Sequence, residues 1–185
     1  MDQKLLIALI VVGAIVAVLL VIGAMRRRSR ELKERFGSEY DRLVAEKGDP
    51  RKAEAELAAR EKRVEKFELK PLAEPDRRRF SEAWLAAQAR FVDDPKGAVA
   101  DANRLVKEVM LARGYPVTDF EHRAADLSVD HPRLVTNYRA AHDIAAKSQR
   151  NAATTEELRT AVVHYRALFE ELLEAREPQV ARRAS

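Results

Sequence analysis

The chain contains one uninterrupted apolar run, Leu5 to Met25, in which no side chain is charged and none is strongly polar. As a helix rising about 1.5 Å per residue, this run would be roughly 30 Å long, the thickness of the hydrocarbon core of a bilayer. A buried core helix of this length would be expected to keep a polar face, and this run has none. The sequence therefore predicts an N-terminal transmembrane helix.

Positive charge is concentrated directly after this run. The residues that form this basic flank are Arg26, Arg27, Arg28, Arg30 and Lys33. Basic residues next to a span stay in the cytoplasm, so we expect a single-pass protein of the bacterial inner membrane with its N-terminus outside and its C-terminal domain in the cytoplasm. A cleaved signal peptide is not favoured, because its charge would come first and its apolar core would be shorter. The flank would either fix topology alone or also attract anionic lipid, by about 1 kcal/mol per basic residue.

The net charge of +4 arises at this flank and not in the rest of the chain. Of 34 basic and 30 acidic residues, one of each lies before residue 26, and six basic and two acidic residues lie in 26–35. That leaves 27 of each sign in residues 36–185. A nucleic-acid-binding domain is expected to carry a basic face of its own, so we expect the bilayer and a protein as partners and no nucleic acid.

The remaining sequence is helical in pattern, with apolar residues recurring every three or four positions and no hairpin signal. The predicted helices are 29–47, 50–67, 75–92, 95–113, 118–127, 132–149 and 155–176. Asp49 and Asp94 each precede a proline, and Thr118 and Thr154 each precede a glutamate by three residues, which are signatures of a helix start. Helix 50–67 has a short 4-3-4-3 seam like that of a coiled coil, in which Arg60 fills one apolar position.

These patterns predict an all-α fold with four parts. Residues 1–28 are the transmembrane anchor with its basic flank, and residues 29–74 are juxtamembrane helices and a linker, with 50–67 as a charged, solvated strut. Residues 75–176 hold most of the aromatic side chains and are expected to fold alone as a compact bundle of about five helices. Residues 177–185 are predicted to be a disordered tail.

Three separated blocks of sequence carry a resemblance to a known group of proteins. They are Arg123 to Pro132 (RAADLSVDHP), RFG with EYD in residues 35–41, and HYRALF in residues 164–169. With these blocks the chain resembles, over roughly residues 30–173, a family of uncharacterised bacterial single-span membrane or "secreted" proteins. The resemblance implies a bacterial source, one span and an all-helical domain, and it implies no activity.

No standard catalytic or phosphate-binding motif is present, and without cysteine both thiol catalysis and cysteine-ligated zinc are excluded. We expect no cofactor. One candidate polar site comprises Asp126, Asp130, His131 and His142. It is centred on a short polar connection before Pro132, where His131 at a helix N-terminus would stay neutral and able to accept a proton. The alternative is that Asp130 or His131 only caps the following helix.

The sequence favours a non-enzymatic, membrane-anchored helical module that binds another protein. The alternatives are a membrane-tethered enzyme or ligand-binding domain with a site between bundle helices, and a protein that binds DNA at the membrane. A concave pocket that holds two or more buried ionisable groups would favour the ligand-binding alternative.

Overall fold

A computed structural model describes the backbone of residues 3–116 and 118–174 and the side chains of residues 12–116 and 118–174. All regular structure in these residues is helical, which confirms the predicted all-α class. The helices are α1 (Gln3–Phe36), α2 (Ser38–Lys47), α3 (Pro50–Val64), α4 (Glu74–Arg90), α5 (Pro95–Ala112), α6 (Phe120–Asp130), α7 (Pro132–Gln149) and α8 (Thr155–Glu174).

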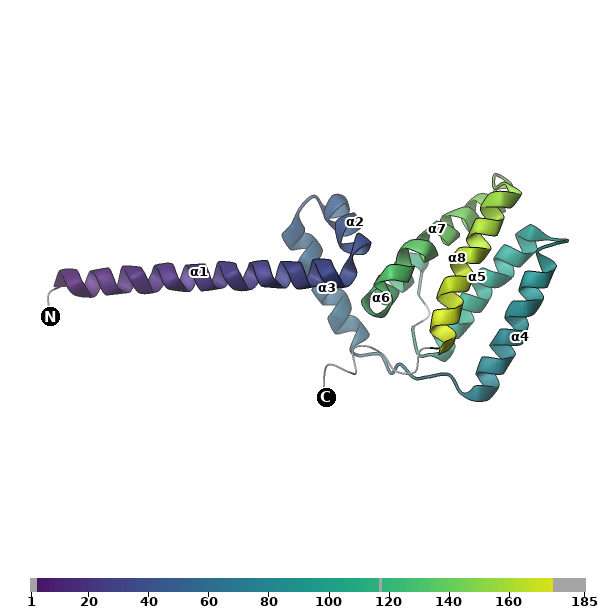
Figure 1. Ribbon diagram of the computed structural model, residues 1–185, viewed down its shortest axis with the longest axis horizontal. Coiled ribbons are helices and arrows are strands. Elements are labelled where there is room, and N and C mark those ends of the chain that lie inside the picture. Colours follow the sequence, from purple (N-terminus) through teal and green to yellow (C-terminus); the bar gives the residue numbers. More distant parts are fainter. Residues whose placement is uncertain (1–2, 117, 175–185) are drawn as a thin grey trace.

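The described helices form a compact body from which α1 projects (Figure 1). In the body, α4 packs on α5, α5 on α8 and α8 on α7, and α6 lies against α7. The pair α2 and α3 sits at the C-terminal end of α1 and contacts the bundle through α6 and α7. The N-terminal half of α1 extends away from all the other elements.

The predicted membrane-spanning helix is not found. Among the residues that the structure describes, no helix is long and apolar enough to cross a membrane. Helix α1 instead continues from the apolar run into the charged residues Arg26 to Arg35 without a break. The predicted single-pass location in the bacterial inner membrane, with an outside N-terminus and a cytoplasmic bundle, was derived from that span and is corrected with it.

The segment predicted as a solvated strut is packed on one face. Helix α3 ends at Val64 and buries Ala53, Leu57, Arg60 and Val64. Leu57 and Val64 lie in a small apolar cluster with Leu32, Phe36 and Tyr40, and Val129 of α6 joins the same cluster. The 4-3-4-3 seam therefore packs within the chain, against α1, α2 and α6.

The larger core lies inside the five helices α4–α8, as predicted. Trp84 of α4 stacks on Phe169 of α8 with ring centroids 4.6 Å apart, and Tyr138 of α7 meets the edge of Tyr165. Val106, Tyr138 and Leu168 are fully buried in this core. Independent folding of residues 75–176 stays a prediction, and the contact of Val129 with the smaller cluster shows that packing crosses the predicted boundary.

Local signals set most helix ends. Asp49 and Asp94 accept the predicted capping hydrogen bonds from the backbone N–H groups of Arg51 and Gly97. The capping box at Thr154 is confirmed, because the Thr154 N–H donates to Glu157 and the Glu157 N–H donates to the Thr154 hydroxyl. The box at Thr118 is wrong, since Asp119 caps α6 by accepting from the His122 N–H.

Two glycines shape the route of the chain. Gly37 has φ 51° and separates α1 from α2, where the sequence predicted one continuous helix. Gly114 has φ 97°, and a Cβ at this position would lie 2.5 Å from the carbonyl oxygen of Glu68. Only glycine fits such a conformation without strain, and Gly114 lets the segment after α3 run against the end of α5. The predicted tail, residues 177–185, lies outside the described residues.

Candidate functional site

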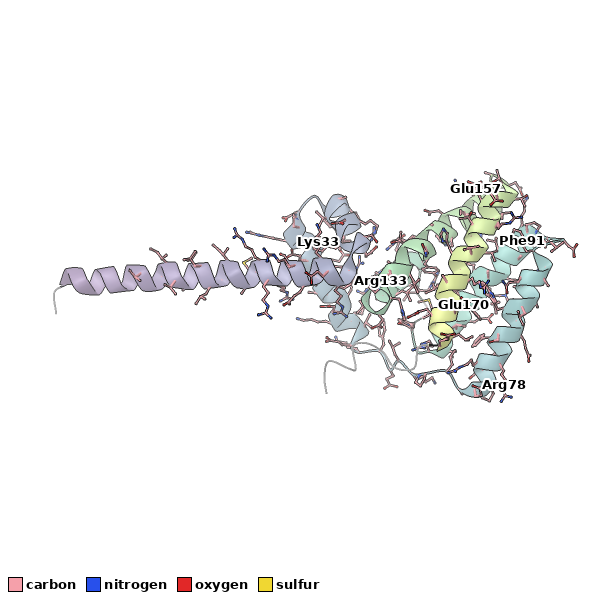
Figure 2. All side chains as sticks on the ribbon, in the orientation of Figure 1. Lys33, Arg78, Phe91, Arg133, Glu157 and Glu170 are labelled. Carbon is pink, nitrogen blue, oxygen red and sulfur yellow. The ribbon has the colours of Figure 1, made fainter. Side chains whose placement is uncertain are left out.

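A groove of about 1850 Å³ lies where α1, the end of α3, the junction of α6 with α7, and α8 come together. Residues from four separate parts of the chain line it, among them Leu32, Val64, Asp130, His131 and Glu171. Arg133, labelled in Figure 2, marks the start of α7 at this groove. Two of the four predicted site residues, Asp130 and His131, lie in this one concave surface.

Asp130 ends α6 with a carboxylate that is almost completely buried and only partly satisfied. The residue is 3% exposed. Its Oδ2 accepts a hydrogen bond from the Tyr115 hydroxyl at 3.1 Å, whereas its Oδ1 has no hydrogen-bond partner among the described residues. Burial raises the pKa of Asp130, and the Tyr115 hydrogen bond and the charges of Arg35 and Arg113 oppose that rise only in part. A buried acceptor without a donor typically costs about 1–3 kcal/mol, so a missing donor at this atom is energetically significant.

His131 forms the joint between α6 and α7. Its side chain is 8% exposed, and its Nδ1 lies 3.3 Å from a carboxylate oxygen of Glu171 on α8. Burial lowers the pKa of His131, which agrees with the predicted neutral ring, but the main cause is loss of water contact. His131 is the N-cap residue of α7, but its side chain makes no capping hydrogen bond, and the described bond of the Asp130 carboxylate is to Tyr115, so neither side chain caps α7.

Asp126 lies one turn earlier on α6 and faces α3, outside the groove. It is 2% exposed and accepts a 2.7 Å hydrogen bond from Nε of Arg63. Burial raises the pKa of Asp126 and the bond to Arg63 lowers it, with burial the larger effect. Asp126 therefore joins α6 to α3 and takes no part in the groove.

His142 is also separate from the groove. It lies on α7, where its ring stacks on Phe120 at a centroid distance of 3.5 Å and an interplanar angle of 9°. Its Nδ1 has no partner among the described residues, and burial lowers the pKa of the ring. The predicted four-residue site therefore divides into three places, and only Asp130 and His131 lie together.

The predicted basic flank lies on α1. Arg27 pairs with Glu31 at 3.0 Å and Lys33 with Asp41 at 3.5 Å, and all four side chains are largely exposed. Arg27 and Arg28 also contribute to the wall of the groove. These basic residues were predicted to flank a membrane span, and no such span is found in the described part of the chain.

A buried ionic cluster, which was not predicted from the sequence, holds α2 and α3 against the bundle. We call Glu39, Arg42, Arg60 and Arg139 the Glu39 cluster. Arg42 and Arg60 each donate to Oε1 of Glu39 at 2.8 Å, and Arg139 of α7 approaches the same oxygen at 3.4 Å. Glu39 is 1% exposed and Arg60 3%. One sequence signal was present, because Arg60 occupies an apolar position of the α3 seam.

Metal binding finds no support in the described part of the chain, where no group of three or more histidine, aspartate or glutamate side chains is arranged to hold an ion. Comparison with protein-family models, with curated proteins and with solved structures gives no match for this chain. Membership in the bacterial family suggested by the three sequence blocks stays a prediction.

Proposed function

We propose that this protein is a non-enzymatic interaction module that binds another protein through α1. The observation that carries this proposal is the exposure of the helix. Nine large apolar side chains between Val12 and Met25 are from 40% to 69% exposed. No other described element lies alongside this part of α1 (Figure 2). A continuous apolar surface of this kind marks an interaction site, because leaving it in water is unfavourable.

The charge that follows the apolar segment indicates the chemistry of the partner. Arg26, Arg27, Arg28 and Arg30 come next along α1, and Glu31 pairs with only one of them. A second copy aligned in parallel would bring these arginines together, and like charges in contact disfavour such a pair. We therefore propose that the partner presents an apolar helix followed by an acidic segment.

Site-specific photo-crosslinking in cells tests this proposal. A photoreactive residue at Leu20, which is 69% exposed on α1, should give one crosslinked product of defined mass. The matched control is Leu85, which is 64% exposed but lies on α4 and not on α1, and it should give none. Introducing Ile15→Glu together with the crosslinker should remove the product, since a charge in the contact must be desolvated. Crosslinks only between copies of this chain, or equal products from Leu20 and Leu85, would contradict the proposal.

A second candidate function is ligand binding at the groove. It is favoured by Asp130 and His131, two buried ionisable groups in one concave surface, and in particular by the unpartnered Oδ1 of Asp130. A thermal-shift screen of small molecules against the full chain tests it. A ligand of this groove should stabilise the protein and lose that effect in Asp130→Asn. A screen whose hits stabilise both proteins equally would count against the groove.

A further inference from the structure

The geometry points to a binding site for an alkylammonium group, R–CH₂–NH₃⁺, in the groove, with Oδ1 of Asp130 as its hydrogen-bond acceptor. This inference deepens the second proposed function by naming the class of ligand. It does not depend on the partner proposed for α1.

In the described part of the chain, the groove lacks a donor at one defined atom, Oδ1 of Asp130. Oδ2 of Asp130 is occupied by the Tyr115 hydroxyl, and Oδ1 has no partner among the described residues. Arg35, which is near, is held by the carboxylate of Glu61 and the carbonyl oxygen of Val129. Arg113 donates to the carbonyl oxygen of Leu172. A ligand with an N–H group would supply the bond that these side chains do not.

The balance of charge around the groove favours a cation. Seven carboxylates and four guanidinium groups line it, so its walls are acidic although the whole chain has a net charge of +4. Glu171 is 53% exposed at the edge, where it approaches the buried His131 ring. A cation is attracted by such a surface.

The hydrogen-bonding state of Asp130 favours an ammonium over a guanidinium. With Oδ2 occupied, Asp130 offers a single acceptor, whereas a guanidinium is best bound by both oxygens of a carboxylate. A primary ammonium is a compact donor on a slim chain, which suits a residue that is only 3% exposed. Leu32, Val64 and Val129 line the same groove and provide apolar contact for the methylene groups that carry the ammonium.

An alkylammonium group has two sources, a lysine side chain of another protein and a free alkylamine. We would titrate the full chain with n-butylammonium chloride and with the peptide acetyl-Gly-Lys-Gly-amide, and follow the His131 ring by NMR. Tetramethylammonium chloride, a cation without N–H groups, is the control for charge alone. A peptide that binds more tightly than butylammonium would identify a protein lysine as the source, and the reverse order would identify a free amine.

Three variants make the test specific. Asp130→Asn should weaken butylammonium binding about tenfold or more, the loss expected for a charge-assisted hydrogen bond. Asp126→Asn is the matched control, because Asp126 is an equally buried carboxylate on the same helix but lies outside the groove. The affinity of this variant for butylammonium should stay within about twofold of the wild type. Tyr115→Phe should tighten binding, since both oxygens of Asp130 would then need a donor.

The outcomes divide cleanly. Saturable binding of butylammonium that depends on Asp130 and is not matched by tetramethylammonium supports the inference. No response of the His131 ring at about 20 mM of either amine, or equal binding by Asp130→Asn, overturns it. If circular dichroism shows that Asp130→Asn does not fold, tighter butylammonium binding by Tyr115→Phe supports the inference, and unchanged or weaker binding overturns it. Binding of a different class of ligand that depends on Asp130 would overturn the ammonium assignment and leave the ligand-binding function standing.

Discussion

Replacing Glu39 by glutamine tests how much the buried ionic cluster contributes to the fold. Glu39 is 1% exposed and accepts hydrogen bonds from Arg42 and Arg60 while Arg139 approaches from α7. Removing one partner of a buried ion pair typically costs about 3–5 kcal/mol, because the remaining charge stays buried without compensation. Since Arg60 keeps Glu56 as a second partner at 2.7 Å, we expect the lower end, about 3 kcal/mol.

Urea unfolding of the full chain, followed by the fluorescence of Trp84, would measure this cost, because Trp84 is the single tryptophan and is buried in the bundle. The matched control is Glu46→Gln, which removes a carboxylate bound to the same Arg42 but 49% exposed, and it should cost less than about 1 kcal/mol. A cost for Glu39→Gln as small as that of the control would refute the reasoning that burial makes this cluster important.

The same cluster has a defined dependence on pH. Burial opposes ionisation of Glu39, but the hydrogen bonds from Arg42 and Arg60 and the charge of Arg139 outweigh it, so the pKa of Glu39 is lowered from 4.5. A lowered folded pKa means that ionised Glu39 stabilises the protein above pH 4.5 and that this contribution is lost as the pH falls further. The stability difference between wild type and Glu39→Gln should therefore shrink below that pH.

Further predictions concern the core, the domain boundary and the groove. Trp84→Ala should cost about 3–5 kcal/mol in urea unfolding because it removes the ring stacked on Phe169, and a cost near zero would mean that the stack is not central to the core. The fragment 75–176 should melt cooperatively but at a lower temperature than the full chain. The reason is that the loss of α3 exposes Val129 and leaves Asp126 without Arg63. Equal melting temperatures would show that α1–α3 add no stability. Burial raises the pKa of Asp130 above 3.8, so ionisation of this carboxyl group destabilises the fold. Asp130→Asn should therefore gain stability relative to the wild type as the pH rises through that raised pKa. A stability difference in urea unfolding that does not change with pH would contradict this.

The features that sequence predicted correctly depend on residues close together in the chain. The caps at Asp49, Asp94 and Thr154 each need only a partner two or three residues away, and the apolar stripes of the bundle need only helical spacing. Such local chemistry is visible in one sequence. The predicted all-α class and the extent of α7 are confirmed for the same reason.

The errors concern groups whose environment is set by distant parts of the chain. Asp126 was grouped with Asp130, His131 and His142, whereas its partner Arg63 is 63 residues away on α3. Arg60 gave a signal by interrupting an apolar seam, but its main partner Glu39 lies on another helix. Asp130 and His131 were predicted to lie in a polar connection between two helices. In the structure Asp130 is the last residue of α6, and His131 joins α6 to α7. Tyr115 and Glu171, which complete their surroundings, have no sequence pattern that connects them to this site.

The continuity of α1 has a mechanical consequence. Its 34 residues form one helix with no break before Gly37, a rod of about 50 Å whose inner end is fixed by Leu32, Arg35 and Phe36. Arg35 is bonded to the backbone carbonyl of Val129, one residue before Asp130. A force that tilts or turns the outer end of α1 therefore acts with a long lever arm on the wall of the groove. The first break in the helix, Gly37, comes after the residues of α1 that line the groove. Movement of the outer end of α1 is therefore transmitted to the joint between α6 and α7 through Arg35.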